Sequence, residues 1–222
     1  AVGRRDVGVA DCDDLVAWSP RTRAILCVHQ MGMPCHLEQL GALARQRGVP
    51  LIEDAACALG SQILRGGLWQ RIGRPQSDVA CFSFHPRKVV STGDGGMLTT
   101  SRADWNEQFH RLRQHAMSVP DTVRHGAQQV IFEHYASVGF NYRMTDIQAA
   151  VGRQQLKRLD DIVQARRALA RQYHELLWDV PGLELPREPA WARSNWQSYC
   201  VMLPPRADQR AVLREAVDDD IH

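Results

Sequence analysis

Lysine is almost absent from this sequence. Of its 27 Lys and Arg residues only Lys88 and Lys157 are lysine, so arginine stands nearly everywhere a positive charge occurs. An arginine guanidinium stays protonated in proteins, whereas a lysine amine can lose its proton, attack a carbonyl and form a Schiff base. A lysine retained among arginines is therefore a candidate for amine chemistry. The count alone leaves open the alternative of a chance surface lysine.

Three further absences narrow the class of protein. No apolar run approaches the about 20 residues that span a bilayer, and no basic and apolar leader opens the sequence, so we expect no membrane partner. The six cysteines form no CxxC pair and no set with zinc spacing, which predicts no metal site and favours a reducing cytoplasm. The net charge of +2, with arginines interleaved among acids, argues against a nucleic-acid partner.

Short apolar runs alternate with amphipathic stretches along the first half of the chain. Such alternation predicts an α/β fold with a mainly parallel sheet. We expect buried strands at 24–28, 49–52, 79–84 and 97–100, a helix from 37 that ends at Gly48, and a second helix over 105–112.

The second half predicts different structure. Residues 118–142 are irregular, which is typical of a functional or interface loop. Thr145 to Gln148 form a capping box that opens a long helical region, where a break is possible near Gly152. A lone strand is expected at 199–203, followed by a helix from about 206. Both ends of the sequence look cut, so we expect a fragment of a longer enzyme.

Polar residues follow three of the predicted strands. His29 ends the first, Asp54 the second, and Ser83 the third, which leads on to Lys88. In parallel sheets ligands bind beyond the carboxyl ends of the strands, so a carboxylate and an amine are expected at one edge. Pyridoxal phosphate (PLP) chemistry needs such a pair, a lysine for the aldehyde and an acid for the pyridine nitrogen. The small side chain of Ala56 leaves room for a flat ring.

Four stretches of sequence resemble the DegT/DnrJ/EryC1/StrS family of PLP-dependent sugar aminotransferases. They occur in family order and extend over nearly the whole chain. The resemblance implies an aspartate-aminotransferase-like PLP fold of type I, with residues 1–156 as the C-terminal part of the large domain and 157–222 as a connecting helix and the start of a small C-terminal domain. The stretches are VHQMGMPCHLEQL (28–40), IEDAACALGS (52–61), SDVACFSFHPRKVVSTGDGGMLTT (77–100) and GFNYRMTDIQAAVGRQQL (139–156).

The resemblance also implies roles for single residues in the cofactor site. Lys88 is expected to form the Schiff base and then to shuttle a proton between Cα and C4′. Asp54 is expected to pair with the pyridinium nitrogen, and Ser83 to bind the phosphate, with Ala56 close to the ring. Asn141 is expected to reach across a dimer interface to the partner's phosphate. The alternatives are a helix N-cap for Asp54 and a core hydroxyl for Ser83.

Other positions are less settled by the resemblance. Arg143 is expected to meet the phosphate or the amino donor's carboxylate, and a surface ion pair remains the alternative. His29 and His85 are expected near the cofactor or substrate, without a part in proton transfer. Cys57 stands where many relatives have a His or Gln that packs on the ring face.

The function implied is transfer of an amino group from glutamate to a nucleotide-linked keto-deoxyhexose, for amino-sugar biosynthesis in a surface polysaccharide or secondary metabolite. The active site would be shared between the subunits of a homodimer. Two alternatives stay open. One is a PLP-dependent sugar dehydratase, in which relatives carry histidine at the position of Lys88. The other is an inactive family member that only binds a partner or folds.

Overall fold

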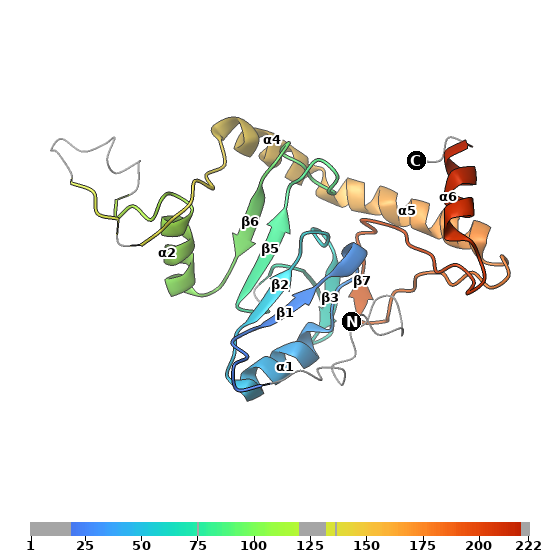
Figure 1. The fold of residues 1–222 in the computed structure, drawn as a ribbon, viewed down its shortest axis with the longest axis horizontal. Coiled ribbons are helices and arrows are strands. Elements are labelled where there is room, and N and C mark those ends of the chain that lie inside the picture. Colours follow the sequence, from blue (N-terminus) through green and yellow to red (C-terminus); the bar gives the residue numbers. More distant parts are fainter. Residues whose placement is uncertain (1–18, 75, 120–131, 136, 219–222) are drawn as a thin grey trace.

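The computed structural model describes residues 19–74, 76–119, 132–135 and 137–218 (Figure 1). Strands and helices alternate through its first half, as the sequence predicts, and helices dominate the second. In chain order the elements are β1 (Ile25–Val28), the 3-10 helix η2 (Gln30–Gly32), α1 (Leu37–Arg47), β2 (Leu51–Asp54), β3 (Gln62–Arg65), β4 (Leu68–Arg71), β5 (Val79–Ser83), β6 (Gly96–Thr99), α2 (Ala103–Leu112), α4 (Asp146–Lys157), α5 (Leu159–Leu177), β7 (Ala192–Arg193) and α6 (Gln209–Asp218).

The four predicted strands form one sheet in the order β1-β2-β5-β6. The pairs β1–β2 and β2–β5 are parallel, and β6 runs antiparallel to β5. At the start of β6, a Cβ on Gly96 would lie 2.8 Å from the carbonyl oxygen of Phe82, so glycine permits the close approach of this edge strand. The prediction of a mainly parallel α/β fold is confirmed.

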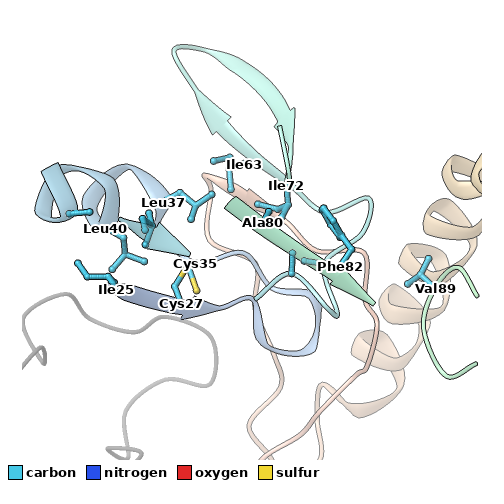
Figure 2. Close-up of a cluster of buried hydrophobic side chains, with 14 of the residues drawn as sticks. Ile25, Cys27, Cys35, Leu37, Leu40, Ile63, Ile72, Ala80, Phe82 and Val89 are labelled. Atoms are coloured by element: carbon cyan, nitrogen blue, oxygen red, sulfur yellow. The ribbon is translucent and has the colours of Figure 1, made fainter. Parts of the chain in front are cut away.

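One face of this sheet is covered and the other is open. In β1 the side chains of Ile25 and Cys27 are buried, whereas Leu26 and Val28 are 61% and 49% exposed. Figure 2 shows Ile25 and Cys27 on the side where α1 packs its apolar residues. Because side chains alternate along a strand, each strand of the sheet contributes residues to both faces. The helix α1 ends as predicted at Gly48, whose φ of 63° is left-handed.

A second sheet lies next to the covered face. It has the order β4-β3-β7 and is antiparallel throughout. The hairpin β3–β4 turns at Gly66 and Gly67, both at positive φ, which suits a tight two-residue turn. Its Ile63 and the nearby Ile72 face Ala80 and Phe82 of the first sheet (Figure 2). The sequence analysis predicted neither the hairpin nor β7.

The second half of the chain differs from the sequence prediction at two places. The capping box at Thr145 is confirmed, but the helical region breaks at Arg158, between α4 and α5, and not near Gly152. The strand expected at 199–203 is wrong, because only Met202 makes an isolated bridge, to Glu184. Tyr199 stacks on Tyr173 of α5 with ring centroids 5.3 Å apart, so this apolar segment packs against a helix.

The domain boundary and the role of the irregular stretch stay predictions. The domain boundary between residues 156 and 157 stays a prediction, beside the observation that β7 pairs with β3. Of the irregular stretch 118–142, residues 120–131 and 136 lie outside the described residues. The remainder forms no helix, and Tyr135 makes an isolated bridge to Met117.

Candidate active site

The open face of the four-stranded sheet carries the predicted acid. The strand register aligns Asp54 with Val28 on one side and with Cys81 on the other. Aligned residues of neighbouring strands point to the same face, so Asp54 shares the open face with the exposed Val28. Ser83, two residues beyond Cys81, points the same way. The site therefore lies at the carboxyl ends of β2 and β5, opposite the face that α1 covers.

Asp54 begins a turn in which one oxygen of its carboxylate is held. Its Oδ1 accepts a hydrogen bond from the backbone N–H of Ala56 at 3.0 Å. Within the described chain Oδ2 has no hydrogen-bond partner. No helix follows, because the chain turns directly into β3, so the helix N-cap alternative for Asp54 is wrong. Burial, together with the negative charges of Asp54 and Glu53, raises the pKa of the Cys81 thiol.

Lys88 is presented by a tight turn after β5. Pro86 stands second in the turn, where its fixed φ is favourable, and the N–H of Lys88 donates to the carbonyl of His85 at 2.9 Å. The hydroxyl of Ser83 accepts a hydrogen bond from the N–H of His85 at 3.3 Å. The half-buried Lys88 amine, Nζ, donates to Sγ of Cys57 at 3.1 Å. The structure thus joins Lys88 to Cys57, whose expected position at the ring face stays a prediction.

A buried polar cluster lies behind the strand ends. Nε2 of His29 lies 2.9 Å from Oε2 of Glu53, and both residues are fully buried. Nδ1 of His29 accepts the N–H of Cys35, which leaves the ring proton on Nε2, where it faces Glu53. Ser77 donates to the other oxygen of Glu53. Both nitrogens of His29 are therefore engaged within the protein, and its expected role near the substrate stays a prediction.

Two residues that the sequence analysis missed hold the loops of the site. The fully buried Asn195 donates from Nδ2 to the carbonyl of Cys57 at 2.8 Å. Gln197 accepts the N–H of Val89 and donates to the carbonyl of Arg87, on the two sides of Lys88. In the sequence, these two residues are marked only as amides next to the aromatic residues Trp196 and Tyr199.

Asn141 and Arg143 lie elsewhere, in the segment between α2 and α4. Figure 1 shows this segment beside the β6 edge, away from β1 and α1. Both side chains are exposed, and Nε of Arg143 donates to Oδ1 of Asn141 at 3.2 Å. Large apolar side chains around them are also exposed, by 49% to 83%. We call this group the exposed apolar segment. Its members are Phe132, Tyr135, Val138, Phe140, Tyr142 and Ile147.

The residues at the strand ends fit PLP. The unpaired Oδ2 of Asp54, the Lys88 amine and the Ser83 hydroxyl supply the three groups that a pyridine nitrogen, an aldehyde and a phosphate require. His85 is exposed beside them, and Ala56 adds little bulk. Within the described residues no cluster of three or more His, Cys, Asp or Glu could hold a metal ion. None of the described helices is long and apolar enough to cross a membrane.

Comparisons with known proteins agree with this arrangement. The model of the DegT/DnrJ/EryC1/StrS aminotransferase family matches residues 14–221. The erythromycin biosynthesis sensory transduction protein EryC1 of Saccharopolyspora erythraea is 36% identical, over 91% of this chain and 50% of EryC1. The spore coat polysaccharide biosynthesis protein SpsC of Bacillus subtilis is 33% identical, over 84% of this chain and 47% of SpsC.

A solved structure gives the same result for the fold. The crystal structure of S. venezuelae DesV, in complex with a ketimine intermediate, aligns with a TM-score of 0.75 and 33% identity, over 91% of this chain and 49% of DesV. The expected PLP fold of type I, present in part, is confirmed. This chain spans about half the length of the relatives that it matches.

Proposed function

The chain belongs to the DegT/DnrJ/EryC1/StrS aminotransferase family, and from that premise we propose that the natural polypeptide transfers an amino group from glutamate to a nucleotide-linked keto-sugar. One observation carries the proposal. A carboxylate on the open face of β2 and a lysine amine after β5 stand at the same carboxyl edge, where the Ser83 hydroxyl ends β5. When bound, PLP supplies an aldehyde that exchanges amino groups and a ring that acts as electron sink.

The chain's own groups divide the work. Oδ2 of Asp54 would accept a hydrogen bond from the protonated ring nitrogen, and Ser83 would donate its hydroxyl to the phosphate. Nζ of Lys88 would hold the cofactor and, once free, would carry a proton between the substrate Cα and C4′. Arginine could not replace this lysine, because its guanidinium does not release a proton. The small Ala56 leaves space for the ring, and the exposed His85 faces the substrate.

We propose that a second copy of the chain completes the site. Asn141 and Arg143 are exposed beside the exposed apolar segment, and large apolar side chains gathered on one surface mark protein interfaces. In the dimer Asn141 donates to the partner's cofactor phosphate, and Arg143 binds the phosphate or the carboxylate of glutamate. The similarity to SpsC, a spore coat polysaccharide biosynthesis protein, supports a sugar as the acceptor.

The test is chemical attachment of the cofactor. The natural polypeptide is incubated with PLP and reduced with borohydride, and its peptides are analysed by mass spectrometry. We expect a pyridoxyl group on Lys88 and none on Lys157, which is exposed on α4 and serves as the control. Absence of the group from Lys88 would overturn the proposal.

A second measurement tests the reaction. With glutamate and a nucleotide-linked keto-deoxyhexose, the protein should form 2-oxoglutarate and an amino-sugar in equal amounts. Lys88→Ala should reduce this activity by at least about 1,000-fold, because Lys157, the other lysine of this sequence, is exposed on α4 and does not belong to the described strand-end site. Loss of a sugar hydroxyl without amine transfer would instead identify a dehydratase.

A further inference from the structure

We propose that Asn195 and Gln197 are positioning residues that hold Lys88 and Cys57 together, an inference that rests on the proposed role of the Lys88 amine. The segment 194–197 follows β7 and lies more than 100 residues from either partner in the sequence. It nevertheless makes hydrogen bonds to both loops of the site. We call it the amide clamp.

The first half of the clamp fixes the backbone around Lys88. Oε1 of Gln197 accepts the N–H of Val89 at 3.1 Å, and Nε2 donates to the carbonyl of Arg87 at 2.8 Å. One side chain thus binds the peptide groups on both sides of Lys88. With both flanking peptide groups fixed, the direction of the Cα–Cβ bond of Lys88 is fixed as well.

The second half fixes Cys57, the contact of the Lys88 amine. Nδ2 of Asn195 donates to the carbonyls of Cys57 and Leu59 at 2.8 and 2.9 Å. Oδ1 of Asn195 accepts the backbone N–H of Gln197 at 2.8 Å, so the Asn195 side chain is joined to the backbone of Gln197. Both ends of the 3.1 Å contact between Nζ of Lys88 and Sγ of Cys57 are therefore bound to one short segment.

The clamp is itself held in an unusual backbone conformation. Trp196, between the two amide residues, has a φ of 51°, a left-handed conformation that is strained for a non-glycine residue and persists only where surrounding contacts enforce it. Nη1 of Arg166, on α5, donates to the carbonyls of Trp196 and Gln197. A Cβ on Gly32 would lie 2.1 Å from Oδ1 of Asn195, so the loop after β1 also fits closely around the clamp.

The experiment compares the reactivity of two lysines in the natural polypeptide. Gln197→Met keeps the length of the side chain and removes both hydrogen bonds. Gln172→Met, on the exposed surface of α5, is the matched control. Formaldehyde with cyanoborohydride methylates free amines, and mass spectrometry gives the ratio of Lys88 to Lys157 methylation below the unfolding temperature. The rate of PLP attachment to Lys88 is measured on the same samples.

We expect Gln197→Met to raise the methylation ratio about threefold or more, because Lys88 leaves its half-buried contact with Cys57. PLP attachment should become about tenfold slower, the size of effect expected for lost hydrogen bonds at a reacting group. Gln197→Glu keeps the acceptor for the N–H of Val89 but loses the donor to the carbonyl of Arg87. Its methylation ratio and its rate of PLP attachment should therefore lie between those of the wild type and Gln197→Met. This variant decides the question if Gln197→Met does not fold.

The outcomes separate the clamp from the proposed function. If PLP never attaches to wild-type Lys88 but the methylation ratio rises in Gln197→Met, the proposed function is overturned and the clamp is supported. If PLP attaches at the same rate in Gln197→Met and the ratio equals that of Gln172→Met, the clamp is overturned. A lower melting temperature alone, with ratio and rate unchanged, means a purely structural role and also overturns it.

Discussion

The strand-end region and the exposed apolar segment differ in where their side chains find contacts. Behind the strand ends, His29, Glu53 and Asn195 are fully buried, and each polar group has a partner within the chain. In the segment 132–147, large apolar side chains lie mostly in solvent, and Phe140 and Tyr142 stack on each other at 5.0 Å. The first region finds its partners within one chain. For the second, the proposed partner is a second copy of the chain.

This contrast is consistent with the proposed site, in which one subunit supplies the strand-end residues and a second copy supplies Asn141 and Arg143. Buried polar groups are tolerated only where every hydrogen bond is made, and such networks hold a single geometry. That rigidity suits the residues that must place Asp54 and Lys88. Exposed apolar groups are stabilised when another surface covers them, so the segment with Asn141 is suited to association. Four changes would sharpen or break the contrast.

Glu53→Ala should produce the largest effect, because it removes one partner of a buried pair. The buried imidazole N–H of His29 would lose its acceptor, and the hydroxyl of Ser77 would keep only the carbonyl of Val79. We expect the free energy of unfolding to fall by about 3–5 kcal/mol. Glu107→Ala, exposed on α2, should change it by less than about 0.5 kcal/mol. Equal losses in urea unfolding would show that the buried cluster contributes no special stability.

Gly32→Ala should be the next most damaging change. The added Cβ would meet Oδ1 of Asn195 at 2.1 Å, at a φ of 93° that disfavours alanine. We expect a loss of about 2–3 kcal/mol from crowding and strain. Gly66→Ala, in the β3–β4 turn, also has positive φ but open space, and should cost about 1 kcal/mol. A thermal melt in which both variants lose the same stability would mean that the clamp region is not tightly packed.

Ile147→Ser tests the other side of the comparison. This residue is 79% exposed at the start of α4, so the substitution should leave the stability of the subunit within about 0.5 kcal/mol. Its loss from an interface should raise the dissociation constant of the dimer about tenfold. Sedimentation velocity measures this constant. Leu68→Ser is the control, because Leu68 is 68% exposed in β4. If both substitutions weaken the dimer equally, the exposed apolar segment is not the specific interface.

Sequence patterns predicted the parts of the fold in which local signals agree. The four strands of the main sheet are short apolar runs, and two of them, β2 and β5, end in Asp54 and Ser83, polar residues of the candidate site. The end of α1 at Gly48 and the capping box at Thr145 were equally local. The hairpin β3–β4 was missed although Gly66 and Gly67 are a turn signal, because apolar and polar residues do not alternate in its strands, QILR and LWQR.

The parts that escaped depend on contacts between distant residues. The strand expected at 199–203 had a suitable composition, but composition indicates burial and does not identify the partner, which is Tyr173 on α5 for Tyr199. Asn195 and Gln197 act on residues more than 100 positions away, so no spacing in the sequence marks them. Only the folded chain brings the amide clamp to Lys88.

Asp54→Asn should give the smallest effect, and it tests whether the acid lies on the open face. Burial and the charges of Asp54 and Glu53 raise the pKa of Cys81, so at a given pH less of this thiol is the reactive thiolate. Removing one negative charge should lower that pKa towards its ordinary range, and iodoacetamide should alkylate Cys81 about two- to threefold faster. Asp94→Asn, in the exposed turn before β6, should leave the rate unchanged. Because Asp54 and Cys81 are aligned in the register, an unchanged rate in Asp54→Asn would mean that the two side chains do not share a face.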